Sequence, residues 1–292
     1  MPLDYCFDTS ALSAKHTASL FDDPDRSALV AGLLASGRVL ITTINVIEAC
    51  GCEDAERRTG VLRLQSELSR QLRPVLPPNE LLRKVTIDHF HQKMTAEITV
   101  SDDHTGIWWS LHEPELLGDT ERDEVYRWKL ALENPFTEAH RKIRPEFEVA
   151  FGSQSKPLSV AHLIRFFRQN ERRILDAVNP TYQAITGGPS LEIAGMRTLF
   201  EDLPAWPLYL GGWAHSLYHR GLKEQGYGAS TNPGTIDLMS AVYLNYCDYF
   251  ITSDTRQRRA LRVLNALNPH QPKTRISSYE EFRNRLVLQA VA

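Results

Sequence analysis

Short apolar segments alternate with helical patterns at both ends of this 292-residue chain, and this alternation most constrains the fold. A strand that is covered on both faces is apolar along its whole length. Strands that alternate with helices favour βαβ units, and therefore a parallel sheet. The predicted strands are Tyr5–Asp8, Arg38–Thr42, Arg73–Leu76, Asp248–Asp254 and Lys273–Ser277.

Helical patterns fill the intervals between these strands, because apolar residues recur there at spacings of three and four. Thr43 is the predicted N-cap of the helix that carries Glu48. Asn232 and Pro233 are predicted to begin the helix that carries Asp237. The predicted helices cover 25–36, 53–72, 79–92, 235–247, 255–267 and 279–288, and a further helix is predicted to begin at residue 44.

The middle of the chain, residues 93–228, follows a different pattern. It is mostly helical in character, rich in aromatic residues and interrupted by prolines. A segment of this length is too long to be a structureless loop in a compact domain. We therefore predict a discontinuous α/β domain made of residues 1–92 and 229–292, with a mainly helical insertion subdomain at 93–228.

The composition bears on nucleic-acid binding, disulfide content and membrane insertion. Lys and Arg number 33 against 36 Asp and Glu, so no overall basic excess indicates nucleic acid, and such a role must depend on a local patch. Four scattered cysteines are too few for a disulfide framework. The sequence has no basic leader with an apolar core and no run of 18 apolar residues. We expect a soluble cytoplasmic protein that does not bind a membrane.

Four carboxylates are predicted to lie at one edge of the sheet. Asp8 and Asp254 end predicted strands, while Glu48 and Asp237 lie near the beginnings of helices. Ligands of open parallel sheets bind outside the carboxyl ends of the strands. Clustered acids raise each other's pKa unless a cation neutralises them, and hard oxygen ligands suit Mg²⁺ or Mn²⁺. Taken alone, each Asp is typical of a turn or a cap, so the prediction depends on the ordered set.

This ordered set resembles the PIN-domain ribonucleases, over residues 1–92 and 229–288. The resemblance depends on FDTSAL near the N-terminus, ITTINVIEA, RPVLPP, GTIDLMSAVYLNYCDYFITSD and RISSYEEF. It implies a three-layer α/β/α sandwich with a central parallel sheet, one or two Mg²⁺ or Mn²⁺ ions, and hydrolysis of RNA phosphodiesters. The long insertion departs from the family pattern.

The resemblance also implies roles for the matching positions. The four acids would form the catalytic centre, and two hydroxyl groups would support it. The implied metal ligands are Asp8, Asp237 and Asp254, the fourth acid is Glu48, and the supporting polar residues are Ser10 and Thr252.

A basic run follows the last of these acids. Arg256, Arg258, Arg259 and Arg262 lie on the helix after Asp254 and are predicted to hold substrate phosphates. The alternative is a solvated helix face, which charge runs usually are.

The expected activity is that of a metal-dependent endoribonuclease, either toxin-type or RNA-processing. Its expected partners are RNA, a cognate inhibitor protein and a second copy in a homodimer. Two alternatives stay open. One is a catalytically silent PIN-like module that binds RNA or a protein through the insertion, and the other is a nuclease for DNA or structured flaps.

Overall fold

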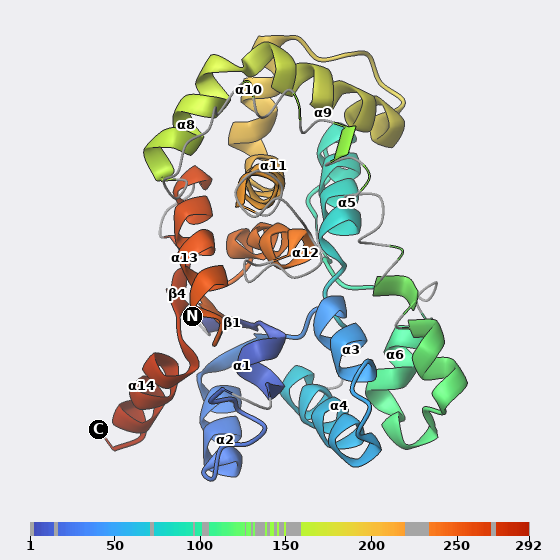
Figure 1. Ribbon diagram of the computed structural model, residues 1–292, viewed down its shortest axis with the longest axis vertical. Coiled ribbons are helices and arrows are strands. Elements are labelled where there is room, and N and C mark those ends of the chain that lie inside the picture. Colours follow the sequence, from blue (N-terminus) through green and yellow to red (C-terminus); the bar gives the residue numbers. More distant parts are fainter. Residues whose placement is uncertain are drawn as a thin grey trace.

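The computed structural model of the chain has an α/β fold that is mostly helical (Figure 1). It describes residues 3–14, 17–70, 73–95, 97–100, 105–125, 127–129, 159–219, 234–269 and 273–291. Between 131 and 149 it also describes residues 131, 138, 141, 142, 145 and 149. In this part of the chain, no helix combines the length and the apolar character that crossing a membrane requires.

A four-stranded parallel sheet lies at the centre, in the order β2-β1-β3-β4. Its long-range pairing joins the two ends of the chain, since Tyr5 is in register with Tyr249. The sequence prediction of a parallel sheet is therefore confirmed. The strands are β1 (Leu3–Phe7), β2 (Gly37–Leu40), β3 (Tyr249–Ile251) and β4 (Arg275–Ser277).

The predicted strand at 73–76 is wrong in extent, because only Val75 pairs. Val75 forms an isolated parallel bridge with Thr42 and an antiparallel bridge with Thr99. The chain then turns away at Pro77, and the next helix begins at Pro78, where proline suits the first helical position. Proline lacks the N–H that a strand would need to continue the ladder.

Helices fill the rest of the described chain. The first part contains α1 (Thr9–Ser13), α2 (Arg26–Ser36), α3 (Thr43–Cys50), α4 (Ala55–Ser69) and α5 (Pro78–Phe90). The middle contains α6 (Thr105–His112), η2 (Pro114–Leu116), α8 (Val160–Gln169), α9 (Glu171–Thr186), α10 (Ile193–Asp202) and α11 (Ala205–Ser216). The last part contains α12 (Thr235–Met239), η4 (Ser240–Asn245), α13 (Thr255–Leu264), η5 (Asn265–Leu267) and α14 (Tyr279–Val291).

Two helix starts differ from the prediction. Thr42, not Thr43, is the N-cap of α3: its Oγ1 accepts from the Asn45 backbone N–H at 3.2 Å, and its backbone N–H donates to Asn45 Oδ1 at 2.9 Å. Thr43 instead donates its hydroxyl to the Val75 carbonyl at 2.7 Å. The capping motif predicted at 232–233 lies outside the described residues, and α12 begins after Gly234.

The helix predicted over 235–247 is shorter than expected. It is α-helical only to Met239 and continues as the 3₁₀ helix η4 to Asn245. The 3₁₀ geometry is common where an α-helix ends in a connector. Strand β3 begins four residues after η4 ends.

Successive strand residues pack into two separate hydrophobic clusters, as the period of two in a strand requires. One cluster contains Cys6, Leu40, Phe250 and Ile276, together with residues of α5 and α8–α13. The other takes Tyr5, Phe7, Val39 and Tyr249, together with α1–α4, α6 and α14. Figure 1 shows α2, α4 and α14 below the sheet, and α5, α11 and α12 above it.

The middle segment packs directly on the elements around the sheet. Helix α11 contacts α12 and α13, and α6 contacts α3 and α4. At the α11–α12 contact a Cβ on Gly212 would lie 2.4 Å from the Leu238 carbonyl oxygen, so this close approach requires glycine. The division into a discontinuous domain and an insertion subdomain stays a prediction.

Candidate functional site

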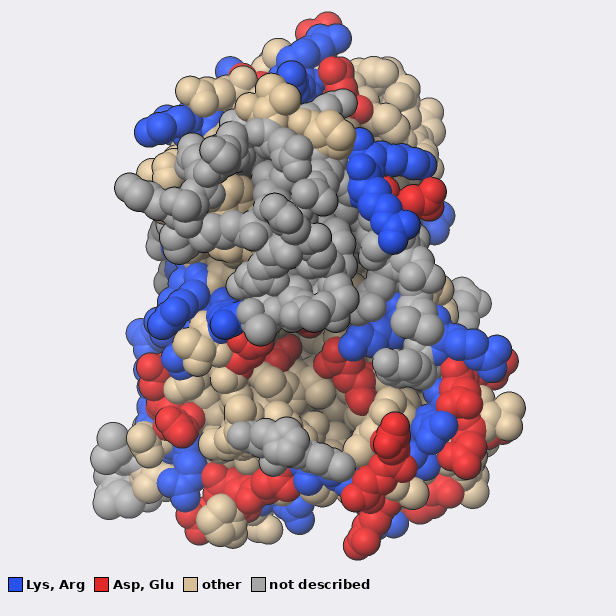
Figure 2. All heavy atoms as spheres, viewed as in Figure 1, with Lys and Arg blue, Asp and Glu red and all other residues tan. Residues whose placement is uncertain are grey.

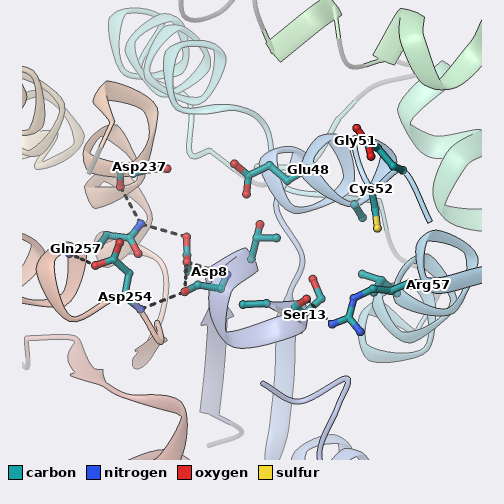
Figure 3. A pocket seen from close by; sticks show the side chains of 15 residues that line it. Asp8, Ser13, Glu48, Gly51, Cys52, Arg57, Asp237, Asp254 and Gln257 are labelled. Carbon is teal, nitrogen blue, oxygen red and sulfur yellow. Dashed lines mark hydrogen bonds between the residues drawn. The ribbon is translucent and has the colours of Figure 1, made fainter. Parts of the chain in front are cut away.

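A cleft of about 570 Å³ lies at the carboxyl edge of the sheet. Asp8 follows β1 directly, Asp254 lies shortly after β3, and Glu48 and Asp237 come from α3 and α12. In Figure 3, Asp8, Asp237 and Asp254 lie on one side of the cleft, and Glu48 reaches toward them. The cleft therefore brings together four acids that are as much as 246 residues apart, from position 8 to position 254.

The same face is seen from outside in Figure 2. Asp and Glu atoms lie at both upper edges of a hollow, and Lys and Arg atoms lie just beyond them. Such an arrangement suits a ligand that carries both a cation and anionic groups, because each charge then meets the opposite one.

Asp8 is half-buried and caps helix α1. Its Oδ2 accepts from the Ser10 backbone N–H at 3.0 Å and from the Ser10 hydroxyl at 2.5 Å. Its Oδ1 accepts from Gln257 Nε2 at 3.1 Å. Burial, and then the charge of Glu48, raise the pKa of Asp8 despite these hydrogen bonds.

The two supporting hydroxyl groups join the ends of β1 and β3. Ser10 Oγ accepts from the Ser253 and Asp254 backbone N–H groups at 3.0 and 3.3 Å. Thr252 Oγ1 lies 3.2 Å from Ser10 Oγ and 3.4 Å from Asp8 Oδ2. These contacts fix the orientation of the Asp8 carboxylate relative to the chain that follows β3.

Gln257 is buried and forms hydrogen bonds to three separate segments of the chain. Its Oε1 accepts from the Thr252 hydroxyl at 2.6 Å, while its Nε2 donates to Asp8 and, at 3.2 Å, to the Asp237 backbone carbonyl. The sequence reasoning missed this residue. A signal was present, because Asp254 and Gln257 have the spacing of a capping box, which places the N3 side chain near the helix start.

Asp237 lies at the third position of α12, where its Oδ2 accepts from the Gly234 backbone N–H at 2.7 Å. It is half-buried. Burial, then Glu48, then Asp8 raise its pKa to about 7. Burial, together with repulsion from Glu48 and Asp8, thus outweighs the favourable end of the helix.

Glu48 has a cationic neighbour that the sequence reasoning also missed. Lys129 Nζ lies 2.8 Å from Glu48 Oε1, and the side chains are 23% and 21% exposed respectively. Lys129 also acts to lower the pKa of Asp237. No motif surrounds Lys129 in the sequence, so only the packing of the middle segment could have identified it.

Asp254 differs from the other three acids. It is exposed and is the N-cap of α13, where its Oδ1 accepts from the Arg256 and Gln257 backbone N–H groups at 2.7 and 3.0 Å. This geometry is the cap alternative that the sequence left open for each Asp, although Asp254 also lines the cleft.

The four arginines after Asp254 do not line the cleft. Arg256 and Arg259 are exposed on α13. Arg262 donates to the Ile276 carbonyl, and both Arg258 and Arg262 lie 3.8 Å from a Glu281 oxygen. Within the described part of the chain, the cation that lines the cleft is Arg57 of α4, on the far side from Asp8 (Figure 3).

The donor set of the cleft fits a hard divalent cation. Asp8, Glu48 and Asp237 offer carboxylate oxygens, which Mg²⁺ and Mn²⁺ prefer. Burial raises the pKa of Asp8 and Asp237 most, repulsion from Glu48 adds to it, and a bound cation would offset both. As the side chains stand, however, the described residues contain no group of three His, Cys, Asp or Glu arranged to hold an ion.

Comparisons with family models, with curated proteins and with solved structures gave no match for this chain.

Proposed function

We propose that the protein is a metal-dependent endoribonuclease of PIN-like fold, of the toxin or RNA-processing type. The observation that carries this proposal is the cleft itself. The four acids singled out in the sequence, which come from separate segments, all line it at the carboxyl edge of a parallel sheet, and the pKa values of Asp8 and Asp237 are raised there. Perturbed carboxylates in a cleft are typical of functional sites.

The packing supports the finer assignment of fold. Strand residues contribute alternately to two clusters, each containing helices, which is the pattern of a three-layer α/β/α sandwich. The bridge between Val75 and Thr42 extends the parallel pairing by one position beyond β2, where the resemblance has its third strand.

In this proposal Asp8 and Asp237 hold one or two Mg²⁺ or Mn²⁺ ions, and Glu48 and Asp254 complete the acidic set. When bound, such an ion activates a water and stabilises negative charge on the phosphate. Water attacks phosphorus, the bond to the 3′ oxygen breaks, and that oxygen takes a proton, which leaves a 5′ phosphate. Ser10 and Thr252 keep the Asp8 carboxylate oriented.

The partners follow from the same chemistry. RNA is the proposed substrate, with Arg256, Arg258, Arg259 and Arg262 as candidate phosphate contacts outside the cleft. A cognate inhibitor protein and a homodimer remain proposals, as does a cytoplasmic location.

The test is cleavage of a labelled RNA panel in Mn²⁺ and in Mg²⁺. Wild type should cleave, and Asp8→Asn should lose about 100-fold or more of the rate, the scale on which metal-site partners act. Asp248→Asn is the matched control, since Asp248 is an exposed acid at the opposite end of β3 and should leave the rate unchanged. Equal rates for wild type and Asp8→Asn would overturn the proposal.

The same experiment addresses the alternatives. A silent module would cleave no RNA and would bind no Mn²⁺ in an Asp8-dependent way. A nuclease for DNA or flaps would be identified by adding those substrates to the panel.

A further inference from the structure

Among the described residues of the middle segment, one lysine contacts an acid of the cleft. Lys129 lies 81 residues after Glu48, and its Nζ is 2.8 Å from Glu48 Oε1. Both side chains are mostly buried, at 23% and 21% exposure, so water screens this pair less than a surface pair. Lys129 also acts electrostatically on Asp237, which belongs to another element. A single ammonium group thus faces two of the acids.

The charges around the cleft are not balanced by this lysine. Of the residues that the structure describes, five carboxylates line the cleft, and they belong to Asp8, Glu48, Glu53, Asp237 and Asp254. The lining cation, Arg57, is already held by a carboxylate of its own, since Arg57 Nη2 lies 2.6 Å from Asp22 Oδ2. The acids near Lys129 therefore retain an excess of negative charge that attracts further cations.

A divalent cation and Lys129 cannot both use Glu48 without cost. Glu48 Oε1 already accepts from the ammonium group, so a cation on either oxygen of this carboxylate would lie within a few ångströms of the Lys129 charge, and two positive charges at that separation repel each other. The metal must therefore displace Lys129 from Glu48 or bind beside it against its charge. Either way the lysine weakens binding.

We propose that Lys129 is a tethered counter-ion that competes with divalent cations for Glu48, so that the middle segment sets the cation affinity of the cleft. This inference rests on the proposed function in naming the cations. It concerns binding alone, however, and makes no claim about which nucleic acid is cleaved.

The experiment is calorimetric titration of the full chain with Mn²⁺ at fixed ionic strength. Lys129→Met, which keeps an unbranched stem, should bind Mn²⁺ about ten-fold more tightly than wild type. Lys129→Arg keeps the charge and should bind like wild type. The matched control is Lys84→Met, which removes a lysine from another carboxylate pair, that with Asp88 on α5, and should also bind like wild type.

A double-mutant comparison keeps the inference testable apart from any loss of structure. In a Glu48→Gln background, Lys129→Met should no longer tighten binding, because the contested carboxylate is gone. Circular dichroism of each variant verifies folding. Equal or weaker binding by Lys129→Met, with Asp8-dependent binding in wild type, would overturn the inference and leave the proposed function standing. If neither wild type nor Lys129→Met bound Mn²⁺, the proposed metal dependence would be overturned, and the inference with it.

Discussion

Aspartates inside the cleft and an aspartate just beyond it have opposite electrostatic environments. Beyond the far end, Asp22 accepts two hydrogen bonds from Arg57, at 2.8 and 2.6 Å, and this guanidinium lowers the pKa of Asp22. At the other end, burial and the neighbouring Glu48 raise the pKa values of Asp8 and Asp237. The ionised form of aspartate is thus stabilised at Asp22 and destabilised at Asp8 and Asp237.

The difference separates an acid that stabilises the fold from acids whose proposed role is to bind a ligand. An acid whose pKa is lowered on folding contributes to stability at neutral pH, whereas an acid whose pKa is raised reduces it. The Asp22–Arg57 pair therefore helps to hold α4 against the segment before α2. The crowded acids cost stability, and a ligand that binds them offsets the cost.

The largest expected effect tests the functional end. Under the proposed function, Asp237→Asn should lower RNA cleavage in Mn²⁺ by about 100-fold or more, because the variant removes a charge from the proposed cation site. Asp22→Asn, at the other end, should change the rate by less than about three-fold, since the paired carboxylate touches no acid of the cleft. Initial rates on one RNA substrate measure both. A larger loss of cleavage rate in Asp22→Asn than in Asp237→Asn would contradict this prediction.

The second expected effect is that Asp237→Asn, which should lower activity, should raise the stability of the fold. The pKa of Asp237 is about 7 in the folded chain against an ordinary value of 3.8, so its protonated form stabilises the fold at low pH. This stabilisation is lost as pH rises from about 4 through 7.

Asp237→Asn should therefore unfold at higher urea concentration than wild type at pH 8. We expect a gain of about 2 kcal/mol, discounted for the partial exposure of the side chain. The difference should shrink toward pH 4, where the wild-type carboxyl is neutral in the folded chain. A variant that is less stable than wild type at pH 8 would contradict the assignment of repulsion to this acid.

The smallest effect tests the structural end. Arg57→Ala should cost about 1 to 2 kcal/mol of unfolding free energy, because it removes the pair with Asp22 and the stacking of the guanidinium 4.9 Å from the Phe21 ring. Arg57 is 15% exposed. Arg38→Ala is the control: Arg38 forms a similar pair with Asp4 but is 56% exposed, and its loss should cost less. Equal losses would show that burial does not distinguish the two pairs.

The strands and the edge occupied by the acids could be predicted because they depend on local patterns. Four of the five predicted strands are confirmed, and the segments carrying Asp8 and Asp254 meet because parallel strands share a carboxyl edge. In the fifth predicted strand, at 73–76, only Val75 pairs. One of its two partners is Thr99, which lies in a distant segment, and no local sequence pattern indicates such a contact. The same limit explains the N-cap: Thr42 and Thr43 are equivalent in the sequence, and the contact with Val75 decides between them.

The charged surroundings of the site could not be predicted. Lys129 meets Glu48 through the packing of helices in the middle segment, which no strand alternation specifies. The arginine run after Asp254 could be located in the sequence, but its place relative to the cleft could not. The direction in which each side chain leaves α13 depends on the neighbouring β4 and α14, which contact Arg262 and Arg258. Phosphate binding by this run stays a prediction.

The central position of β1 also has a consequence for the time course of folding. Tyr5 on β1 pairs on one side with β2 soon after synthesis, but its partner on the other side is Tyr249, 244 residues later. At about 5–20 residues per second, a ribosome needs roughly 10 to 50 s to supply that partner. Until then the nascent chain has an apolar strand with an open edge, a template for pairing with other chains. Residues 1–92 produced alone should therefore aggregate unless a chaperone or the C-terminal segment covers that edge.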